Sequence, residues 1–147
     1  MTEPAFVDTN ILVYSRDAEE PVKRASANEL LDFLWESRLG RVSQQVLQEY
    51  YVTVTRKLKP GLPKPEARDD IEALLAWQPL AATSANFSKA WDIEDRFGLS
   101  WWDSHIVASA LQARCAILFS EDMQDGLQVD GLRICNPLVP EFDVTSL

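Results

Sequence analysis

Apolar runs and helix-patterned segments alternate along this chain. The first run, 5–7, ends on Asp8, and a second apolar stretch starts at Ile11 after two small polar residues. This pattern predicts a buried strand, a tight turn and a helix whose N-cap oxygen comes from Thr9 or Asn10. Asp8 then lies at the carboxyl end of the strand, the edge at which ligands gather in open parallel sheets. On this stretch alone, a plain turn or capping role for Asp8 is the simpler interpretation.

Five further segments have the apolar spacing of amphipathic helices. They span about 21–37, 44–58, the residues after Pro65, 84–97 and 100–114. We expect Ser84 to cap the fourth of these helices and Gly98 to end it. The large side chains expected to face inward include Trp35, Tyr51, Leu75, Phe87 and Trp91.

Short apolar stretches between these helices predict the remaining strands. They are 41–43, a weak strand at 79–83, 116–119 and 132–135. Strands that alternate with helices predict an α/β fold, a three-layer sandwich in which a central parallel sheet of about four to five strands is flanked by helices. Since 147 residues are too few for two cores, we expect one domain over 1–147, with a surface tail from about 137 to 147.

Composition limits the chemistry that this chain can carry. Cys115 and Cys135 lie in or beside apolar runs, and we expect buried, reduced thiols in a cytoplasmic protein. A single histidine and this wide cysteine spacing argue against a zinc site. No stretch is long and uncharged enough to span a membrane, and the N-terminus lacks the pattern of a signal peptide.

The formal net charge of −9 bears on the choice of partners. A protein that grips nucleic acid by electrostatics alone usually carries a basic stripe. Two interpretations fit so acidic a chain. Either it has nothing to do with nucleic acid, or some carboxylates converge on a divalent metal that supplies the positive charge.

Three other acids occupy positions comparable to that of Asp8. Asp122 closely follows the 116–119 strand, and it reaches the edge that holds Asp8 if the two strands are parallel. Asp103 lies in the first turn of an almost wholly apolar helix, where it is either a capping residue or the top of a buried stripe. Glu49 lies at the margin of an apolar stripe, the usual place of a solvated rim residue.

Carboxylates brought together without lysine or arginine partners take up protons or bind a cation. Oxygen-only sites suit Mg²⁺ or Mn²⁺, and a hydrated ion can position and activate a water for attack on phosphorus. This chemistry needs no serine triad and no histidine. His105 comes two residues after Asp103, but a lone helical histidine is more often structural.

Four short motifs resemble, in order and spacing, those of the PIN-domain family, and within it the VapC-type ribonuclease toxins of toxin–antitoxin pairs. They are Asp8-Thr9-Asn10, Gln48-Glu49-Tyr50, Trp102 to Ala110 and Ser120 to Gly126. The resemblance extends over nearly the whole chain. It implies a small α/β sandwich and Mg²⁺- or Mn²⁺-dependent cleavage of single-stranded or looped RNA by a metal-activated water. It also implies homodimers and an antitoxin that blocks the cleft.

Carried over residue by residue, the resemblance assigns roles to the acids and to their polar neighbours. Asp8, Asp103 and Asp122 would hold the metal, directly or through water, and Glu49 would complete the acidic cluster. Asp125 is a candidate fifth acid, and its role stays open. The residues implied to fix these carboxylates are Thr9, Asn10, Ser104 and Ser120.

Several alternatives stay open at this point. The chain is also compatible with a PIN nuclease for ordinary RNA processing, or with a nuclease-inactive PIN module that binds RNA or protein. Adjacent Trp101 and Trp102 cannot face the same way on a helix; we expect both in the core, the alternative being that one stacks on a base. The basic residues around the Pro-rich loop either meet an RNA backbone or form ordinary solvated surface; they are Arg56, Lys57, Lys59, Lys64 and Arg68.

Overall fold

A five-stranded sheet runs through the middle of the molecule, in a computed structural model that describes residues 1–147. Its strands stand in the order β2-β1-β3-β5-β4. β2, β1, β3 and β5 are parallel, and β4 joins the edge antiparallel to β5. The strand bounds are Ala5–Val7 for β1, Gly40–Arg41 for β2, Ile117–Phe119 for β3, Gln128–Val129 for β4 and Leu132–Cys135 for β5.

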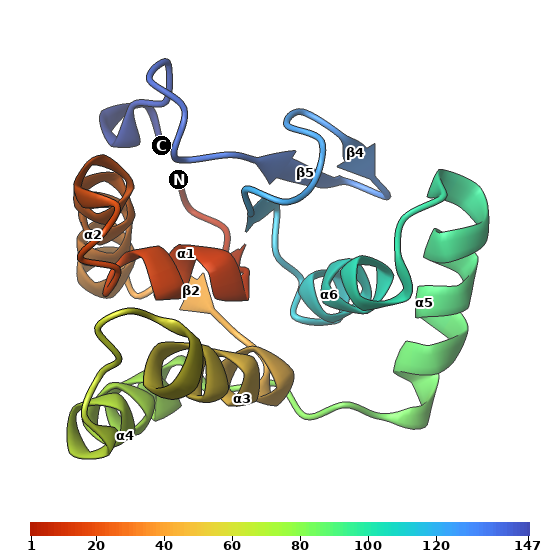
Figure 1. The fold of residues 1–147 in the computed structure, drawn as a ribbon. Helices are drawn as coiled ribbons and strands as arrows, with labels where there is room; N and C mark the ends of the chain where they lie inside the picture. Colours follow the sequence, from red (N-terminus) through yellow and green to blue (C-terminus); the bar gives the residue numbers. More distant parts are fainter.

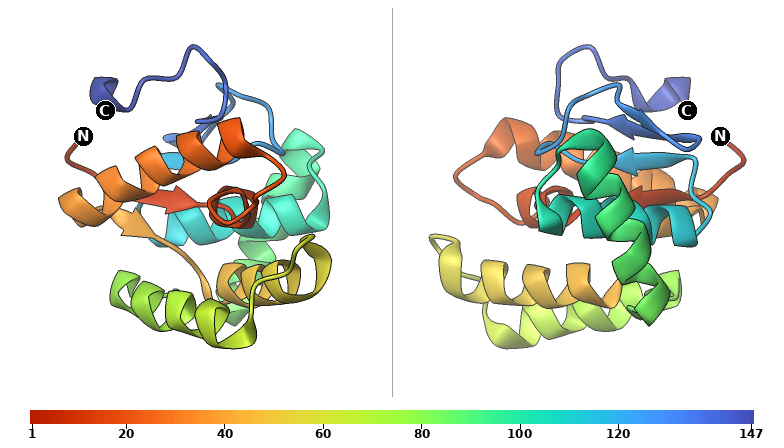
Figure 2. Two further views of the ribbon diagram at one scale, coloured as in Figure 1. Left: turned by 60° about the vertical axis from the view of Figure 1, so that its left-hand side comes forward. Right: turned by 90° about the vertical axis from the view of Figure 1, so that its right-hand side faces the viewer.

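Helices cover both faces of this sheet, as Figure 1 and Figure 2 show. α2 lies against one face, α6 lies against the other, and α5 packs on the outside of α6. α3 and α4 form a hairpin beyond the β2 edge, with α3 in contact with α1. The expected α/β sandwich around a mostly parallel sheet is confirmed. The helix bounds are Thr9–Tyr14 for α1, Pro21–Ser37 for α2, Gln44–Val52 for α3, Lys64–Leu74 for α4, Ser84–Phe97 for α5 and Trp101–Gln112 for α6.

Burial of the short strands explains why they form. Every residue of β1 and β3 is buried, as expected for parallel strands that are covered on both faces. Leu30 and Leu34 of α2 are fully buried in the same core as Phe6 and Leu118 of the sheet. The helical spacing of the α2 leucines therefore fixes which side of this helix meets the sheet.

Two helix caps differ from those expected. Asp8 itself caps α1, so Thr9 and Asn10 are already helical. Thr83, rather than Ser84, caps α5, through a capping box with the side chain three residues into the helix. In both places several short polar residues compete for the cap. The N-cap is in each case the last residue with an extended backbone before the helix, Asp8 or Thr83.

Three segments differ from their expected secondary structure. The strand expected at 41–43 begins and ends earlier, as β2, and the segment 79–83 contributes only an isolated bridge between Leu80 and Ser43. α3 does not continue as an α-helix to 58; it changes at Thr53–Lys57 into a π-helical turn.

The strand β4 was not expected. It forms because the chain reverses at Asp130 and Gly131, which both have a positive φ and so give a tight turn into β5. An Asp-Gly pair between apolar residues is a hairpin signal, and it could have revealed this strand in the sequence.

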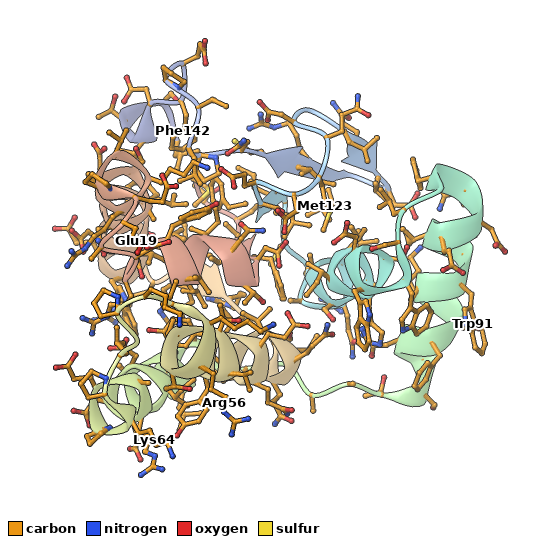
Figure 3. The ribbon with its side chains drawn as sticks, in the orientation of Figure 1. Glu19, Arg56, Lys64, Trp91, Met123 and Phe142 are labelled. Carbon is orange, nitrogen blue, oxygen red and sulfur yellow. The ribbon has the colours of Figure 1, made fainter.

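Four large side chains expected to face inward lie at the surface instead: Trp35, Leu75, Phe87 and Trp91. α5 packs mainly on α6, and only a narrow stripe of α5 that includes Ala90 and Ile93 is buried in this contact. Figure 3 shows Trp91 on the outer side of α5, away from the sheet. Trp35 packs on Trp77, with ring centroids 4.9 Å apart, and Tyr51 is half-buried.

One ion pair joins the turn that follows α1 to the α3–α4 hairpin. Arg16 donates to the two carboxylate oxygens of Asp70 at 2.6 and 2.9 Å, and the Tyr50 hydroxyl donates to the same carboxylate. Because Tyr50 is next to Glu49 on α3, this contact fixes the position of the helix that carries one of the candidate acids.

The C-terminal segment packs beside the N-terminus (Figure 1). The N-terminal amine donates to the Leu147 carbonyl, and the Phe142 ring meets Phe119 edge-on with centroids 6.0 Å apart. Val144–Ser146 forms a 3₁₀ turn. Across the chain, no helix combines the length and the apolar character that crossing a membrane requires.

Candidate active site

Parallel pairing of β1 with β3 sets the first site residues side by side. Because Val7 pairs with Phe119, the next residues of both strands emerge together at the carboxyl edge of the sheet. There the Ser120 hydroxyl donates to Asp8 Oδ2 at 2.8 Å. Asp122 follows two residues later, and its N–H donates to the Ser120 hydroxyl at 3.2 Å. One serine thus links the two acids that the sequence predicts at this edge.

Asn10 also joins these two carboxylates. Its side-chain amide donates to Asp8 Oδ2 at 3.3 Å and to Asp122 Oδ2 at 3.0 Å. Its Oδ1 accepts the N–H of Glu121 at 3.2 Å, which holds the amide in this orientation. Asp8 Oδ1 accepts the Thr9 N–H at 2.7 Å, so Asp8 caps α1 and faces the site at the same time.

Glu49 is turned toward this group of acids by neutral hydrogen-bond donors. The Thr9 hydroxyl donates to Glu49 Oε2 at 2.8 Å, and the Gln45 side-chain amide donates to Glu49 Oε1 at 3.0 Å. Glu49 is half-buried in this arrangement, so it is not a freely solvated rim residue.

Asp103 comes from the first turn of α6, on the other side of the cleft. Ser100 caps this helix, since its hydroxyl accepts the Asp103 N–H at 3.1 Å. The carboxylate is half-buried and lines the same cleft as the other three acids. The cap is therefore supplied by the Ser100 side chain, and the Asp103 carboxylate lines the cleft at the start of the buried helix.

The four carboxylates line one cleft that encloses about 560 Å³. None of the four is paired with a lysine or arginine, because every ion pair of the protein lies elsewhere. Lys57 is the one cationic side chain among the residues that line the cleft. The cleft therefore carries an uncompensated negative charge.

Burial and mutual repulsion disfavour the charged form of two of these acids. Burial is the main cause that raises the pKa of Asp8 from 3.8 to about 6, and the charges of Asp122 and Asp103 raise it further. Hydrogen bonds from Ser120 and Thr9 lower this pKa and offset only part of the rise. The pKa of Asp103 is raised as well, first by burial and then by Asp122. A cation in the cleft would favour the ionised forms.

The donor chemistry of the cleft fits a hard divalent cation. Its candidate ligands are all carboxylate oxygens, the ligand type that Mg²⁺ and Mn²⁺ prefer. No three acidic, histidine or cysteine side chains converge closely enough to enclose an ion by themselves. Since Mg²⁺ usually keeps several of its waters and takes only one or two carboxylates directly, an open set of acids suits a hydrated ion.

A comparison with protein-family models decides the family. The model of the PIN domain matches residues 5–125, a range that includes all four acids of the cleft. The chain belongs to the PIN domain family. PIN domains are generally nucleases that use divalent metals such as Mg²⁺, so the family indicates a hydrolase of nucleic acid. No curated protein sequence matches the chain.

Four candidate residues do not line the cleft of this PIN domain. Ser120 is fully buried and reaches the site only through its hydrogen bonds, which include those with Asp8 and Asp122. The Ser104 hydroxyl is fully buried and forms no hydrogen bond, so the contact with a carboxylate implied by the resemblance is absent. Asp125 accepts the N–H of Asn136 at 3.0 Å and so holds a loop at the end of β5. His105 is buried and packs edge-on against Phe87 and Trp101, which is the structural role expected.

Other polar residues line the cleft but were not foreseen as part of it: Tyr14, Asp17, Gln45 and Thr53. The Tyr14 hydroxyl donates to Glu121 at 2.7 Å, and Lys23 pairs with the same carboxylate at 2.9 Å. Gln45 lies four residues before Glu49 on α3, a spacing that could have signalled their contact. Of the basic residues near the Pro-rich loop, only Lys57 lines the cleft; Figure 3 shows Arg56 and Lys64 on the outer side of the α3–α4 hairpin.

Proposed function

We propose that this PIN domain is an Mg²⁺- or Mn²⁺-dependent endoribonuclease that hydrolyses RNA phosphodiester bonds. One observation carries the proposal: carboxylates from the junction between β1 and α1, from α3, from α6 and from the loop after β3 line a single cleft without a cationic partner. The family supports a nuclease, and the resemblance to VapC-type toxins supports RNA as the substrate.

In this proposal Asp8, Asp103 and Asp122 hold the cation, directly or through water, and Glu49 orients a water molecule. A bound divalent cation would supply an activated water for attack on phosphorus and would stabilise the leaving oxygen. Asn10 and the Ser120 hydroxyl keep Asp8 and Asp122 in place through the hydrogen bonds described above. Such partners of metal-binding carboxylates fix their orientation.

The test is cleavage of total bacterial RNA by the purified protein with Mg²⁺, Mn²⁺ or EDTA. We expect discrete fragments with either metal, and none with EDTA or with Asp8→Asn. Asp130→Asn is the matched control, because Asp130 lies outside the cleft on the turn between β4 and β5. Identical RNA patterns from folded wild type and Asp8→Asn would instead favour a nuclease-inactive PIN module that binds RNA or protein.

We further propose that the protein is the toxin of a type II toxin–antitoxin pair, acting in the cytoplasm as a homodimer with a cognate antitoxin. The resemblance to VapC-type toxins supports this role. An apolar groove of about 560 Å³ between α3 and α4, lined by Leu47, Val52, Ile71 and Leu75 among others, provides surface for a protein partner. Expression should arrest bacterial growth, and the product of an adjacent antitoxin gene should relieve the arrest. Normal growth with active nuclease would favour ordinary RNA processing.

A further inference from the structure

Trp102 is the most exposed tryptophan of the protein, and it lies in the acidic cleft. It precedes Asp103 on the first turn of α6, and 63% of its surface is exposed. It lines the same cleft as Asp8 and Asp122. Of the large apolar side chains that are exposed, Trp102 alone lines this cleft, so its ring is offered to whatever binds beside the acids.

The other four tryptophans all pair with aromatic rings of the domain. Trp35 packs on Trp77 with centroids 4.9 Å apart, and Trp91 lies 6.4 Å from Trp101. Trp102 forms no aromatic pair. Its ring face therefore contributes nothing comparable to the packing of the fold.

The geometry of α6 explains why two adjacent tryptophans differ. Successive residues on an α-helix point about 100° apart. Trp101 turns toward α5, where it stacks on Phe87 at 6.0 Å with the ring planes 13° apart. Trp102 points in another direction, and it lines the cleft together with residues of α1 and α3. The expectation that both rings pack in the core is wrong for Trp102.

Lys57 lines the same cleft from the end of the π-helical turn that follows α3. It forms no ion pair within the protein, so its ammonium group is available to a phosphate. The cleft thus offers an aromatic face from α6 and a cation from the turn after α3, together with the acids.

We infer that Trp102 is the stacking platform for an unpaired nucleobase next to the phosphate that is cleaved. The inference rests on the proposed function and adds a specificity element to it. An indole face stacks on any base, whereas a base within a duplex already has both faces covered by its neighbours. Trp102 therefore selects unpaired nucleotides without selecting their sequence, while Lys57 meets the strand backbone.

The experiment compares two labelled strands by fluorescence anisotropy, with Mg²⁺ and in an Asp8→Asn background that does not consume the RNA. One strand is a short oligouridylate, and the other is a strand of equal length that lacks bases. Trp102→Ala should weaken oligouridylate binding roughly tenfold, within the range measured for base–aromatic stacking. It should leave binding of the abasic strand unchanged, and Trp102→Phe should restore most of the lost affinity.

Trp91→Ala is the matched control, because Trp91 is also exposed, at 55%, but lies on α5 outside the cleft. It should not change binding of either strand. The inference is overturned if Trp102→Ala weakens both strands equally, if it changes neither, or if the parent protein binds neither. Failure of the nuclease proposal is seen separately, as absence of metal-dependent cleavage by wild type. A binding-only PIN module would still show the Trp102-dependent preference for bases.

Discussion

Two acidic regions of this protein use aspartate in opposite ways. On the surface near β4, Asp130 accepts from Lys89 and Arg96, each at 2.8 Å, and these cations hold its pKa well below the usual range. In the cleft, Asp8 is hydrogen-bonded only by neutral donors, and burial raises its pKa to about 6.

The comparison shows what distinguishes a structural acid from a candidate catalytic one. Asp130 is exposed to solvent and is neutralised by fixed side chains, so it contributes a surface ion-pair cluster. Asp8 is 5% exposed and has no fixed cation. The fold has therefore kept a buried negative charge that only a mobile cation or a proton can neutralise.

The largest expected effect is on catalysis. Asp103→Asn and Asp122→Asn should each lower the rate of metal-dependent RNA cleavage by about a thousandfold or more, since each removes a charge that the reaction needs. Asp130→Asn should leave the rate unchanged, because its carboxylate lies outside the cleft. Single-turnover kinetics measure this rate. If all three variants lost the same fraction of it, the acids of the cleft would not differ from Asp130 in their role.

The next effect is on stability, and its sign is opposite for the two regions. The folded-state pKa of Asp8 is raised, so the folded protein binds the proton of this carboxyl more tightly than the unfolded chain does. The stability that this proton contributes is full below pH 3.8 and is lost as the pH rises through about 6. In EDTA at neutral pH, Asp8→Asn should raise the free energy of unfolding by up to about 3 kcal/mol. The gain should vanish near pH 3.8.

Asp130→Asn should lower stability at neutral pH instead, by a small and salt-sensitive amount, because it removes an exposed partner of two cations. Urea unfolding at neutral and acidic pH checks both variants. A loss of stability in Asp8→Asn at neutral pH would contradict the claim that the cleft charge is uncompensated.

A smaller effect should follow from the contact between Thr9 and Glu49. Thr9→Val removes the hydroxyl that donates to Glu49 at 2.8 Å but keeps the shape of the side chain. The cleavage rate should fall roughly tenfold, as is typical when the partner of a metal-site carboxylate is removed. Thr9→Ser retains the hydroxyl and should keep most of the activity. If Thr9→Ser, which loses only the methyl group, lowered the rate and Thr9→Val did not, the hydroxyl of Thr9 would have no role in positioning Glu49.

The sequence allowed the placement of Asp8 and Asp122 to be predicted because it depends on local patterns. Both strands are continuous apolar runs, and strands joined through helices are parallel, so the acids after them share one edge. The range of α2 could also be predicted, from the proline near its start and the helical spacing of its leucines.

Side-chain direction at the margin of a helix could not be predicted, since it depends on how widely a neighbour covers that helix. Phe87 and Trp91 lie on the apolar stripe of α5, and Trp101 of α6 packs beside both rings, but only Ala90 and Ile93 of this stripe become buried. The direction of Glu49 depends on the Thr9 hydroxyl, which is 40 residues away in the chain. The local sequence around these residues predicts neither arrangement.

The most direct test of the central claim is the effect of Mg²⁺ on the melting temperatures of wild type, Asp8→Asn and Asp130→Asn. A ligand that binds only the folded state at about 100 times its Kd adds about 2.7 kcal/mol, which is roughly 5 °C or more for a domain of this size. We predict this rise for wild type and Asp130→Asn, and little or none for Asp8→Asn. An equal rise in all three proteins, or no rise in wild type, would contradict the account of the cleft as a cation site.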